Sequence, residues 1–516
     1  MSRRMRERDI NKPPAHASIW AAGLVVACLW ISLFFPKLLP GLSIKAVAWV
    51  FISAFLMSPI LYGKRLRNFG ITLISVVGAV DIFHVYYFGT LSDEYLIATI
   101  LRTNTQEAAD FWKTLPILPG IGALAWLVYT FIVRKFLGNI FSLGRGISHI
   151  ALAVGCLALI AWLGIGMVYL AAGATQKVEV ELKVRNVYPA HVVWAVAKQK
   201  YMSGAVIYKP TAPEVQPDSR KIPIIVAVIG ESATSQRWSL LGYQAADTNK
   251  ELNGLSGTKI FGVMARGFAT VSALPYVMTG FSAEQSIKNK SPSFLDLAKF
   301  SGYKVFVFDN SRSFRGGDFF GQLLRRSTDV YKKVGNGDHD GILTSWLEGA
   351  VKDPAPYKLI VLHTFGSHEI ATDRYPREFD KTGDPYDNSI VYTSHLLRYW
   401  IDILGVSDKA SVLLYTSDHG LSMPPCRPAY IHKRSMSSLE VPFLMYGNRI
   451  AHDEYPEFFR IDDEHDNSNA LLGQKVVEGS GYQRLVREGV WPRSGNPVFE
   501  NKRWSELKRL DACSLS

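Results

Sequence analysis

The feature that most constrains this chain is the crowding of its apolar residues into the first third. Five apolar runs with almost no charge lie there: Ile19–Phe35, Ile44–Tyr62, Phe69–Phe88, Ile117–Leu137 and Ile147–Ala171. Each is close to the roughly 20 residues that a helix needs to cross a bilayer. The rest of the 516 residues resembles a soluble protein in composition. The sequence therefore predicts an N-terminal transmembrane bundle of five helices, residues 1–172, followed by a soluble part.

The charges around these runs indicate the orientation of the bundle. The N-terminus and the loops 63–68 and 134–145 are rich in Lys and Arg, and the alternate loops are poorer in positive charge. By the positive-inside rule the N-terminus lies in the cytoplasm. After five crossings the soluble part lies on the opposite face of the membrane, in the periplasm or at the cell exterior. The same flanking residues supply much of the net charge of +12, so we predict membrane lipids and no nucleic acid as partners.

Two further segments are expected at the membrane surface. The outer loop 92–113 has apolar residues at helical spacing, which predicts an amphipathic helix. This helix either lies on the membrane or covers a site for a lipid substrate. Residues 173–220 are predicted to form a surface helix and a proline-rich, semi-rigid linker, so that the soluble domain spans residues 221–516.

The four cysteines give no metal-binding pattern. Cys28 and Cys156 lie inside apolar runs, where cysteine is an ordinary packing residue, and no CxxC or Cys/His zinc spacing is present. Cys426 and Cys513 lie in the soluble part. They can form a disulfide in an oxidising compartment, and the sequence leaves this pairing open.

Four short β-rich runs define the class of the soluble domain: Pro223–Gly230, Tyr303–Phe308, Tyr357–Leu362 and Ser411–Thr416. Each run is almost continuously apolar, as in strands that are buried on both faces. Helix-like segments separate them. This alternation predicts an α/β domain with a mostly parallel sheet and helices on both faces.

Polar residues follow each of these four runs, in chain order Glu231, Asp309–Asn310, His363 with His368, and Asp418–His419. Open α/β sheets bind ligands at the carboxyl ends of their strands. One such Asp alone would indicate a turn or a helix cap, but four sets together predict a metal site. Carboxylate and imidazole ligands suit Zn²⁺, with Mn²⁺ or Mg²⁺ less favoured. Glu231, Asp418 and His419 supply three ligands, which leaves the fourth position for a hydroxyl that becomes a nucleophile.

The candidate hydroxyl lies in the segment Ala265–Gly280, where small residues and a threonine precede a helix-like run. A hydroxyl at a helix N-terminus lies where the backbone amides stabilise an incoming phosphate. Thr270 and Ser272 both qualify on this reasoning. Without metal ligands nearby, an ordinary N-cap threonine would be the simpler interpretation.

Several motifs carry a resemblance to a known family. Ile229–Tyr243 reads IGESATSQRWSLLGY, Leu362–His368 reads LHTFGSH, and Ser417–Gly420 reads SDHG. With these motifs the chain resembles, over nearly its whole length, the phosphoethanolamine transferases of the alkaline phosphatase/sulfatase superfamily, which include enzymes that modify lipid A and lipooligosaccharide. The resemblance implies a metal-dependent transfer of phosphoethanolamine from phosphatidylethanolamine, through a phospho-threonine intermediate, to a surface glycolipid or glycan of the lipopolysaccharide type.

The resemblance also implies the roles of individual residues. Glu231, Asp418 and His419 match metal ligands, and Thr270 matches the nucleophile at the zinc. Pro275 follows Thr270 at the family's spacing, which favours this threonine over the serine two residues later.

Five further residues match positions that contact substrate in the family: His368, His432, Arg315, Thr103 and Glu107. The two histidines and Arg315 match phosphate-binding positions, with a second-metal role as the alternative for His368. Thr103 and Glu107 lie in the outer loop and match residues proposed to hold the lipid headgroup.

The chain departs from the family at several positions. Leu421 replaces the acidic residue after the DHG motif, so the number of zinc ions stays open. Arg266 and Tyr276 replace a cysteine pair of the lipid A enzymes, and Thr99 replaces their headgroup asparagine. A core sugar or another glycan is therefore at least as good an acceptor as lipid A. The alternatives are a phosphoglycerol transferase of the same superfamily and a non-catalytic membrane binding protein on this fold.

Overall fold

The structure is a computed structural model, and it divides the chain into two compact units, Met1–Ile97 with Leu115–Gln199 and Ala98–Thr114 with Lys200–Ser516. It describes residues 24–25, 27–39, 41–57, 64–88, 91–93, 96–97, 100, 117–140, 149–171, 183–205, 208–311, 319–335, 338–426, 429–461, 467–491, 498–499, 502–503, 509–511 and 513–515.

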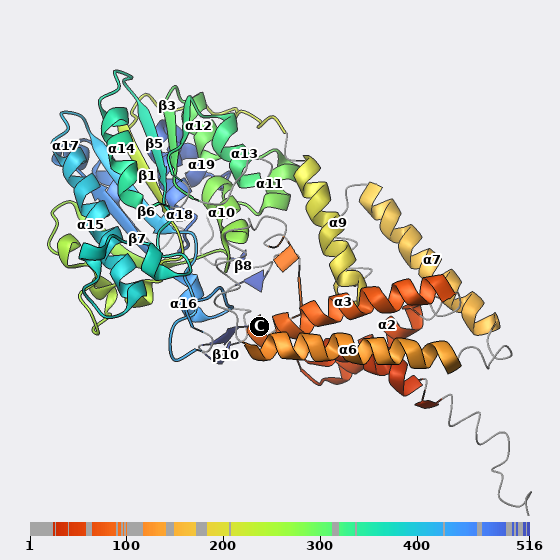
Figure 1. The fold of residues 1–516 in the computed structure, drawn as a ribbon. Coiled ribbons are helices and arrows are strands. Elements are labelled where there is room, and N and C mark those ends of the chain that lie inside the picture. The colour runs from red at the N-terminus through yellow and green to blue at the C-terminus, as the bar shows by residue number, and fades with distance from the viewer. Residues whose placement is uncertain are drawn as a thin grey trace, which may run out of the picture. The chain divides into compact units, whose positions relative to one another are not determined.

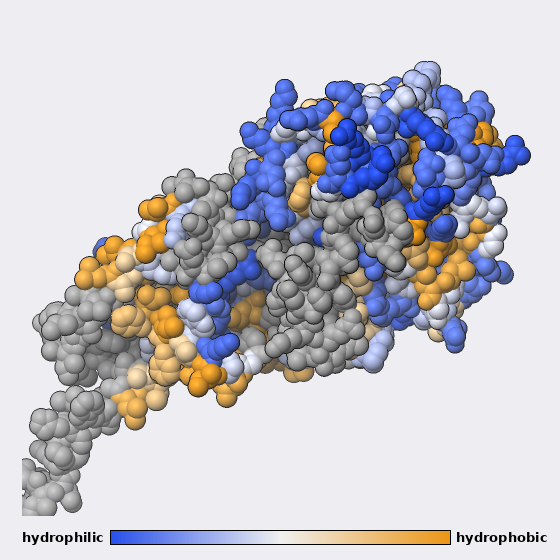
Figure 2. All heavy atoms as spheres, turned by 180° about the vertical axis from the view of Figure 1, so that it is seen from behind, coloured by the Kyte–Doolittle hydropathy of each residue, from blue (hydrophilic) through white to orange (hydrophobic). Residues whose placement is uncertain are grey.

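The first unit consists of helices: η1 (Phe35–Leu38), α2 (Ile44–Met57), α3 (Lys64–Phe88), α6 (Ile117–Ile140), α7 (His149–Ala171), η3 (Val184–Asn186) and the start of α9 (Ala190–Ala205). Many of their large apolar side chains are exposed, such as Ile117 and Phe131 of α6. Figure 2 shows hydrophobic residues gathered over these helices, in contrast to the mostly hydrophilic surface of the second unit. Such a surface is expected of helices that face lipid.

The prediction of five spans is supported only in part. Within the described residues, two helices are long and apolar enough to cross a membrane, Arg65–Tyr87 and Ile117–Phe136. The apolar helices Ile44–Met57 and Leu157–Tyr169 are shorter. Residues 19–23 and 26 of the first predicted run, 58–62 of the second and 147–148 of the fifth lie outside the described residues.

Asp81, an ionisable residue inside α3, has its own buried partners. Its Oδ1 accepts a hydrogen bond from the backbone amide of Ser92 at 2.8 Å, and its Oδ2 lies 3.2 Å from Nε2 of His191. Because a charge among apolar helices is costly unless it is paired, these contacts explain how the carboxylate is tolerated.

The second unit is built on a seven-stranded sheet with the order β2-β7-β6-β1-β5-β3-β4. The strands are β1 (Ile224–Gly230), β2 (Thr258–Met264), β3 (Lys304–Asp309), β4 (Val330–Lys333), β5 (Lys358–His363), β6 (Ser411–Ser417) and β7 (Glu440–Gly447). The four predicted runs are β1, β3, β5 and β6, and they pair in parallel. Strand β7 pairs antiparallel with β6 and β2. The predicted mostly parallel α/β sheet is confirmed.

Helices cover both faces of this sheet, as Figure 1 shows. The central strand β1 explains why, since Ile225, Ala227 and Ile229 belong to one buried apolar cluster and Val226 and Val228 to the other. Full burial of an aliphatic side chain stabilises a fold by about 1.5–3 kcal/mol, so a strand without polar side chains requires cover on both sides. The helices of this unit are α10 (Thr270–Thr279), α11 (Ala283–Asn289), α12 (Phe294–Phe300), α13 (Phe319–Arg326), α14 (Leu343–Val351), α15 (Pro385–Gly405), α16 (Met436–Leu439), α17 (Arg449–Glu454), α18 (Leu471–Val477) and α19 (Gln483–Arg487).

The C-terminal segment adds short strand pairs and one covalent link. Strands β8 (Val498–Phe499) and β9 (Lys502–Arg503) form one pair, and β10 (Arg509–Asp511) and β11 (Ser514–Leu515) form another. Next to the second pair, Cys513 forms a disulfide with Cys426. The pairing that the sequence left open is therefore present.

Candidate metal centre and nucleophile

The candidate centre lies where two neighbouring strands of the sheet end. Strands β1 and β6 run in parallel and in register, with Gly230 opposite Ser417. Glu231 follows the first strand and Asp418–His419 follow the second, so the pairing brings their side chains to one place although they are almost two hundred residues apart in the chain. The hydrogen bond from the Asp418 amide to the Gly230 carbonyl, 3.1 Å long, continues the strand pairing into the site.

Thr270 reaches the same place from a different element. It is the first residue of α10, directly after the extended N-cap residue Ala269. Its Oγ1 lies 3.2 Å from Oε2 of Glu231 and 3.3 Å from Nε2 of His419. The structure thus brings together the four residues that the sequence analysis assigned to the metal centre.

The three acidic and imidazole side chains can hold a metal ion. One ligand atom each from Glu231, Asp418 and His419 lies within 4.8 Å of the others, and all three residues are buried. Nδ1 of His419 donates to the Gly420 carbonyl at 2.9 Å, which turns Nε2 toward the carboxylates. The buried Oδ2 of Asp418 lies 3.4 Å from Nε2 of His419, without a hydrogen bond of good geometry from a described residue. Two buried carboxylates, one of which has an oxygen without a hydrogen bond, fit a divalent cation.

The charges of this group depend on one another. Burial, followed by the charge of Glu231, raises the pKa of Asp418 to about 6. Burial by itself lowers the pKa of His419, but the carboxylates of Asp418 and Glu231 outweigh it and raise this pKa to about 9. Burial also raises the pKa of Glu231, yet the hydrogen bond and charge of His419 bring it well below its usual value. Without a metal, a proton on His419 therefore offsets the negative charge of the two carboxylates, and a bound cation can offset it in the same way.

The backbone around Glu231 is fixed by close packing. The Ser367 amide donates to the Glu231 carbonyl at 2.9 Å, and a Cβ on Gly366 would lie 2.4 Å from the same oxygen. Gly366 has a φ of +52°, which favours glycine. Both amides of Phe365 and Gly366 donate to the buried carboxylate of Asp340, at 2.8 Å each. This loop, 365–367, thus lies between the backbone of Glu231 and His368, the next residue in the chain.

The two histidines predicted to contact phosphate lie beside the centre. The ring of His432 is 4.7 Å from the ring of His419 and 5.7 Å from the ring of His368, measured between centroids. Burial, together with the charge of His419, lowers the pKa of His432 to about 3, so its ring is neutral. Nδ1 of His432 lies 3.4 Å from the Phe268 carbonyl, so the neutral ring donates to a phosphate oxygen only in the tautomer with its proton on Nε2.

Two other predicted residues contact each other. Asp309 and His363 pair with each other, Oδ1 to Nδ1 at 3.0 Å, at the ends of β3 and β5. Arg315, Thr103 and Glu107 lie outside the described residues.

The comparisons with known proteins agree with this geometry. Residues 223–472 match the family model described as Sulfatase. These residues form a sulfatase-type domain. The chain is 27% identical, over 320 residues, to "Phosphoethanolamine transferase EptC" of Escherichia coli O18:K1:H7, and the match covers 54% of each chain. The chain thus spans about half the length of that relative.

Two solved structures share the fold. The integral membrane protein lipooligosaccharide phosphoethanolamine transferase A (EptA) of Neisseria meningitidis is 19% identical with a TM-score of 0.55, over 92% of this chain and 94% of that chain. The C-terminal periplasmic domain of EptC from Escherichia coli in complex with Zn is 23% identical with a TM-score of 0.50, over 59% of this chain and 99% of that chain. The likeness to EptA extends beyond the sulfatase-type domain.

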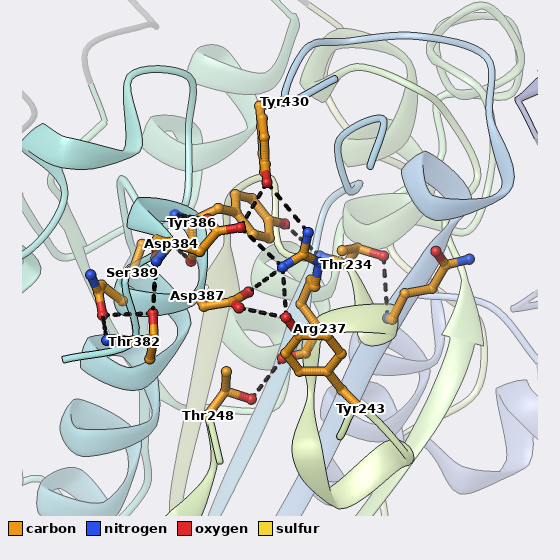
Figure 3. Close-up of polar contacts among 12 residues, drawn as sticks. Thr234, Arg237, Tyr243, Thr248, Thr382, Asp384, Tyr386, Asp387, Ser389 and Tyr430 are labelled. Carbon is orange, nitrogen blue, oxygen red and sulfur yellow. Dashed lines mark hydrogen bonds and ion pairs between the residues drawn. The ribbon is translucent and has the colours of Figure 1, made fainter. Parts of the chain in front are cut away.

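Two polar features of the sulfatase-type domain were not predicted from the sequence. Glu369 lies next to His368 in the chain, is buried, and accepts a hydrogen bond from the His432 amide at 3.1 Å. Arg237 forms the centre of a second network, drawn in Figure 3, with Tyr243 and Asp387. Both positions fall in or directly after motifs that were quoted for the resemblance, which is the signal that could have found them.

Proposed function

We propose that this protein is a phosphoethanolamine transferase. It takes phosphoethanolamine from phosphatidylethanolamine and passes it, through an intermediate on Thr270, to a surface glycolipid or glycan of the lipopolysaccharide or lipooligosaccharide type. The names of the relatives, EptC and EptA, support the transferred group. The observation that carries the proposal is the Thr270 hydroxyl within 3.3 Å of both Glu231 and His419.

Glu231, Asp418 and His419 would hold Zn²⁺, with the Thr270 oxygen as the fourth donor. The carboxylate and imidazole donors and the zinc complex of the EptC domain support zinc as the metal. When bound, zinc supplies a positive charge that lowers the pKa of a hydroxyl and offsets the charge that develops on a phosphoryl group. The number of zinc ions is not part of the proposal.

The chain's own residues then act in two steps. Thr270 attacks the phosphorus of the donor lipid, the bond from phosphorus to the diacylglycerol oxygen breaks, and diacylglycerol leaves with the proton. A hydroxyl or phosphate oxygen of the acceptor next attacks the phosphorus of the phosphoethanolamine-threonine, the bond from phosphorus to Oγ1 breaks, and Thr270 is restored by taking up a proton. His368, His432 and Arg315 hold the phosphate, and Thr103 and Glu107 hold the headgroup of the donor.

We further propose that the protein lies in an inner membrane, with its N-terminus in the cytoplasm and the sulfatase-type domain in the periplasm. This arrangement gives Thr270 access to a lipid donor. The Cys426–Cys513 disulfide supports an oxidising compartment for the domain.

The decisive experiment compares Thr270→Ala with Ser272→Ala. Ser272 is a matched control because its hydroxyl donates to the Ala269 carbonyl at 2.8 Å and its side chain lies only two residues further along the same helix. The zinc-loaded full-length protein is incubated with labelled phosphatidylethanolamine, and released diacylglycerol and the mass of the peptide that contains residue 270 are measured. We expect release and a phosphoethanolamine adduct in the wild type and in Ser272→Ala, and neither in Thr270→Ala.

The same assay tests the alternatives. Phosphatidylglycerol as the preferred donor would indicate a phosphoglycerol transferase, and zinc binding without release from any donor would indicate a binding protein. An adduct that persists in Thr270→Ala would refute the assignment of the nucleophile.

A further inference from the structure

The segment that carries His432 has little secondary structure of its own. Between β6 and α16, residues 421–426 and 429–435 contain no helix or strand among those described. The segment folds back on itself, with the Ser422 amide donating to the Ile431 carbonyl at 2.9 Å. Tyr430 has a left-handed φ of +60°, which is rare for a residue with a side chain. Contacts outside the segment must therefore hold this backbone in place.

The hydroxyl of Tyr430 provides such a contact. It donates to Oδ2 of Asp384 at 2.7 Å and accepts from the Arg237 guanidinium at 3.4 Å. Figure 3 shows the tyrosine reaching down to the guanidinium and the carboxylate. Asp384 is the N-cap of α15, where its other oxygen accepts from the Tyr386 amide at 2.9 Å. A rigid helix end thus anchors a residue two positions before His432.

The same helix end also anchors the metal-ligand loop. Arg237, six residues after Glu231, donates to Oδ1 of Asp387 at 2.7 Å and to Asp384 at 3.2 Å. The Tyr386 hydroxyl donates to the Ser232 carbonyl at 2.6 Å. The first turn of α15 therefore connects the loop after β1 to the segment that carries His432.

One guanidinium and two carboxylates carry the charges of this network. Burial raises the pKa of Asp384, but hydrogen bonds from Tyr430 and from the Tyr386 amide, with the charge of Arg237, bring it below its usual value. The Arg237 side chain is only 11% exposed and faces two carboxylates. Buried ion pairs contribute little net stability. They do fix the geometry of a site, because leaving one buried partner unpaired costs free energy.

We propose that Tyr430 is a positioning residue: its hydroxyl, held by Asp384 and Arg237, sets the place of His432 beside the metal centre. The proposal rests on the phosphate-binding role of His432 in the proposed function. A displacement of about 1 Å in a positioning group can lower a rate about 100-fold. Loss of the hydroxyl should therefore lower the rate of transfer although Tyr430 itself touches no reacting atom.

A double-mutant cycle tests this inference. Diacylglycerol release is measured for Tyr430→Phe and His432→Ala, singly and together, in the zinc-loaded full-length protein. We expect Tyr430→Phe to lower kcat about 10- to 100-fold with unchanged zinc content, and to have no further effect when His432 is already alanine. Equal effects in both backgrounds would overturn the inference.

Tyr243→Phe is the matched control, because its hydroxyl also joins Arg237 and Asp387 but lies on a different segment. Its effect, whatever its size, should be the same in both backgrounds. Hydrogen–deuterium exchange of the peptide that contains residues 429–433 gives a reading independent of activity. Faster exchange in Tyr430→Phe and not in Tyr243→Phe supports the inference, and unchanged exchange refutes it.

The two proposals fail differently. If His432→Ala leaves transfer unchanged, the phosphate role of His432 in the proposed function is wrong, while the exchange measurement still decides whether Tyr430 holds the segment. If His432→Ala lowers transfer and Tyr430→Phe changes neither rate nor exchange, only the positioning role of Tyr430 is wrong.

Discussion

The close approach of Gly366 to Glu231 predicts a specific effect of adding one methyl group. In Gly366→Ala the new Cβ would lie 2.4 Å from the Glu231 carbonyl oxygen and 2.9 Å from its nitrogen. Both distances are too short for a carbon atom, so the backbone of the metal-ligand loop has to move. The substitution therefore affects zinc binding although residue 366 donates no ligand.

The magnitude has two parts. An alanine at positive φ costs about 1–2 kcal/mol, and forcing an extra carbon into a packed site costs about 1–3 kcal/mol. We expect Gly366→Ala to lose about 2–5 kcal/mol of the free energy of unfolding. Gly254→Ala is the matched control, because Gly254 has a φ of +70° and an added Cβ there would meet no described atom within 4 Å. The control should lose only the first part, about 1–2 kcal/mol.

Thermal unfolding of the purified protein, with zinc and with a chelator, measures both parts. At about 2–4 °C per kcal/mol, Gly366→Ala should melt several degrees below Gly254→Ala. Zinc titration should show weaker binding in Gly366→Ala alone. Equal melting temperatures and equal zinc affinity in the two variants would refute the reasoning that Gly366 fixes the position of Glu231.

Two further predictions concern charge. Burial raises the pKa of Asp309, but the hydrogen bond from His363, with the charge of Lys333, outweighs it and lowers this pKa below the usual 3.8, so the contacts of this carboxylate add stability above pH 3.8 that is lost as the pH falls through the lowered pKa. Asp309→Asn should thus lose about 2–3 kcal/mol at pH 7 and approach the wild type in thermal unfolding below pH 3.8; a constant difference across pH would contradict this. Because the pKa of Asp418 is raised to about 6, its charge opposes folding at pH 7 when no metal is bound. In chelator, Asp418→Asn should melt no lower than the wild type, whereas added zinc should raise the melting temperature of the wild type more; a variant that melts lower in chelator would show that Asp418 stabilises the metal-free fold.

The central strands could be predicted from the sequence because burial on both faces leaves a simple pattern. The predicted runs agree with β1, β3, β5 and β6 to within a residue at each end. Strand β7 contains Pro442. Proline lacks the backbone N–H that donates to a neighbouring strand, so it normally argues against a central strand. Strand β2 is partly exposed along its length and β4 has four residues, so neither produces a continuous apolar run.

The meeting of the candidate metal ligands could be predicted for a related reason, since parallel neighbouring strands end at the same edge of a sheet. Glu231 and Asp418 meet because β1 and β6 are adjacent, and the sequence did not need to specify any long-range contact beyond that. The contact of Tyr430 with Asp384 joins positions 46 residues apart through irregular backbone. No periodicity describes such a segment, and sequence reasoning missed it.

The disulfide has a consequence for the order in which the protein matures. Cys513 lies 87 positions after Cys426, beyond the last strand of the seven-stranded sheet. A ribosome releases residues in order, so every strand of the sheet emerges before the bridge can close. A newly made chain that has not met an oxidant can therefore bring its candidate metal ligands together before the disulfide links Cys426, in the segment that bears His432, to the C-terminal segment.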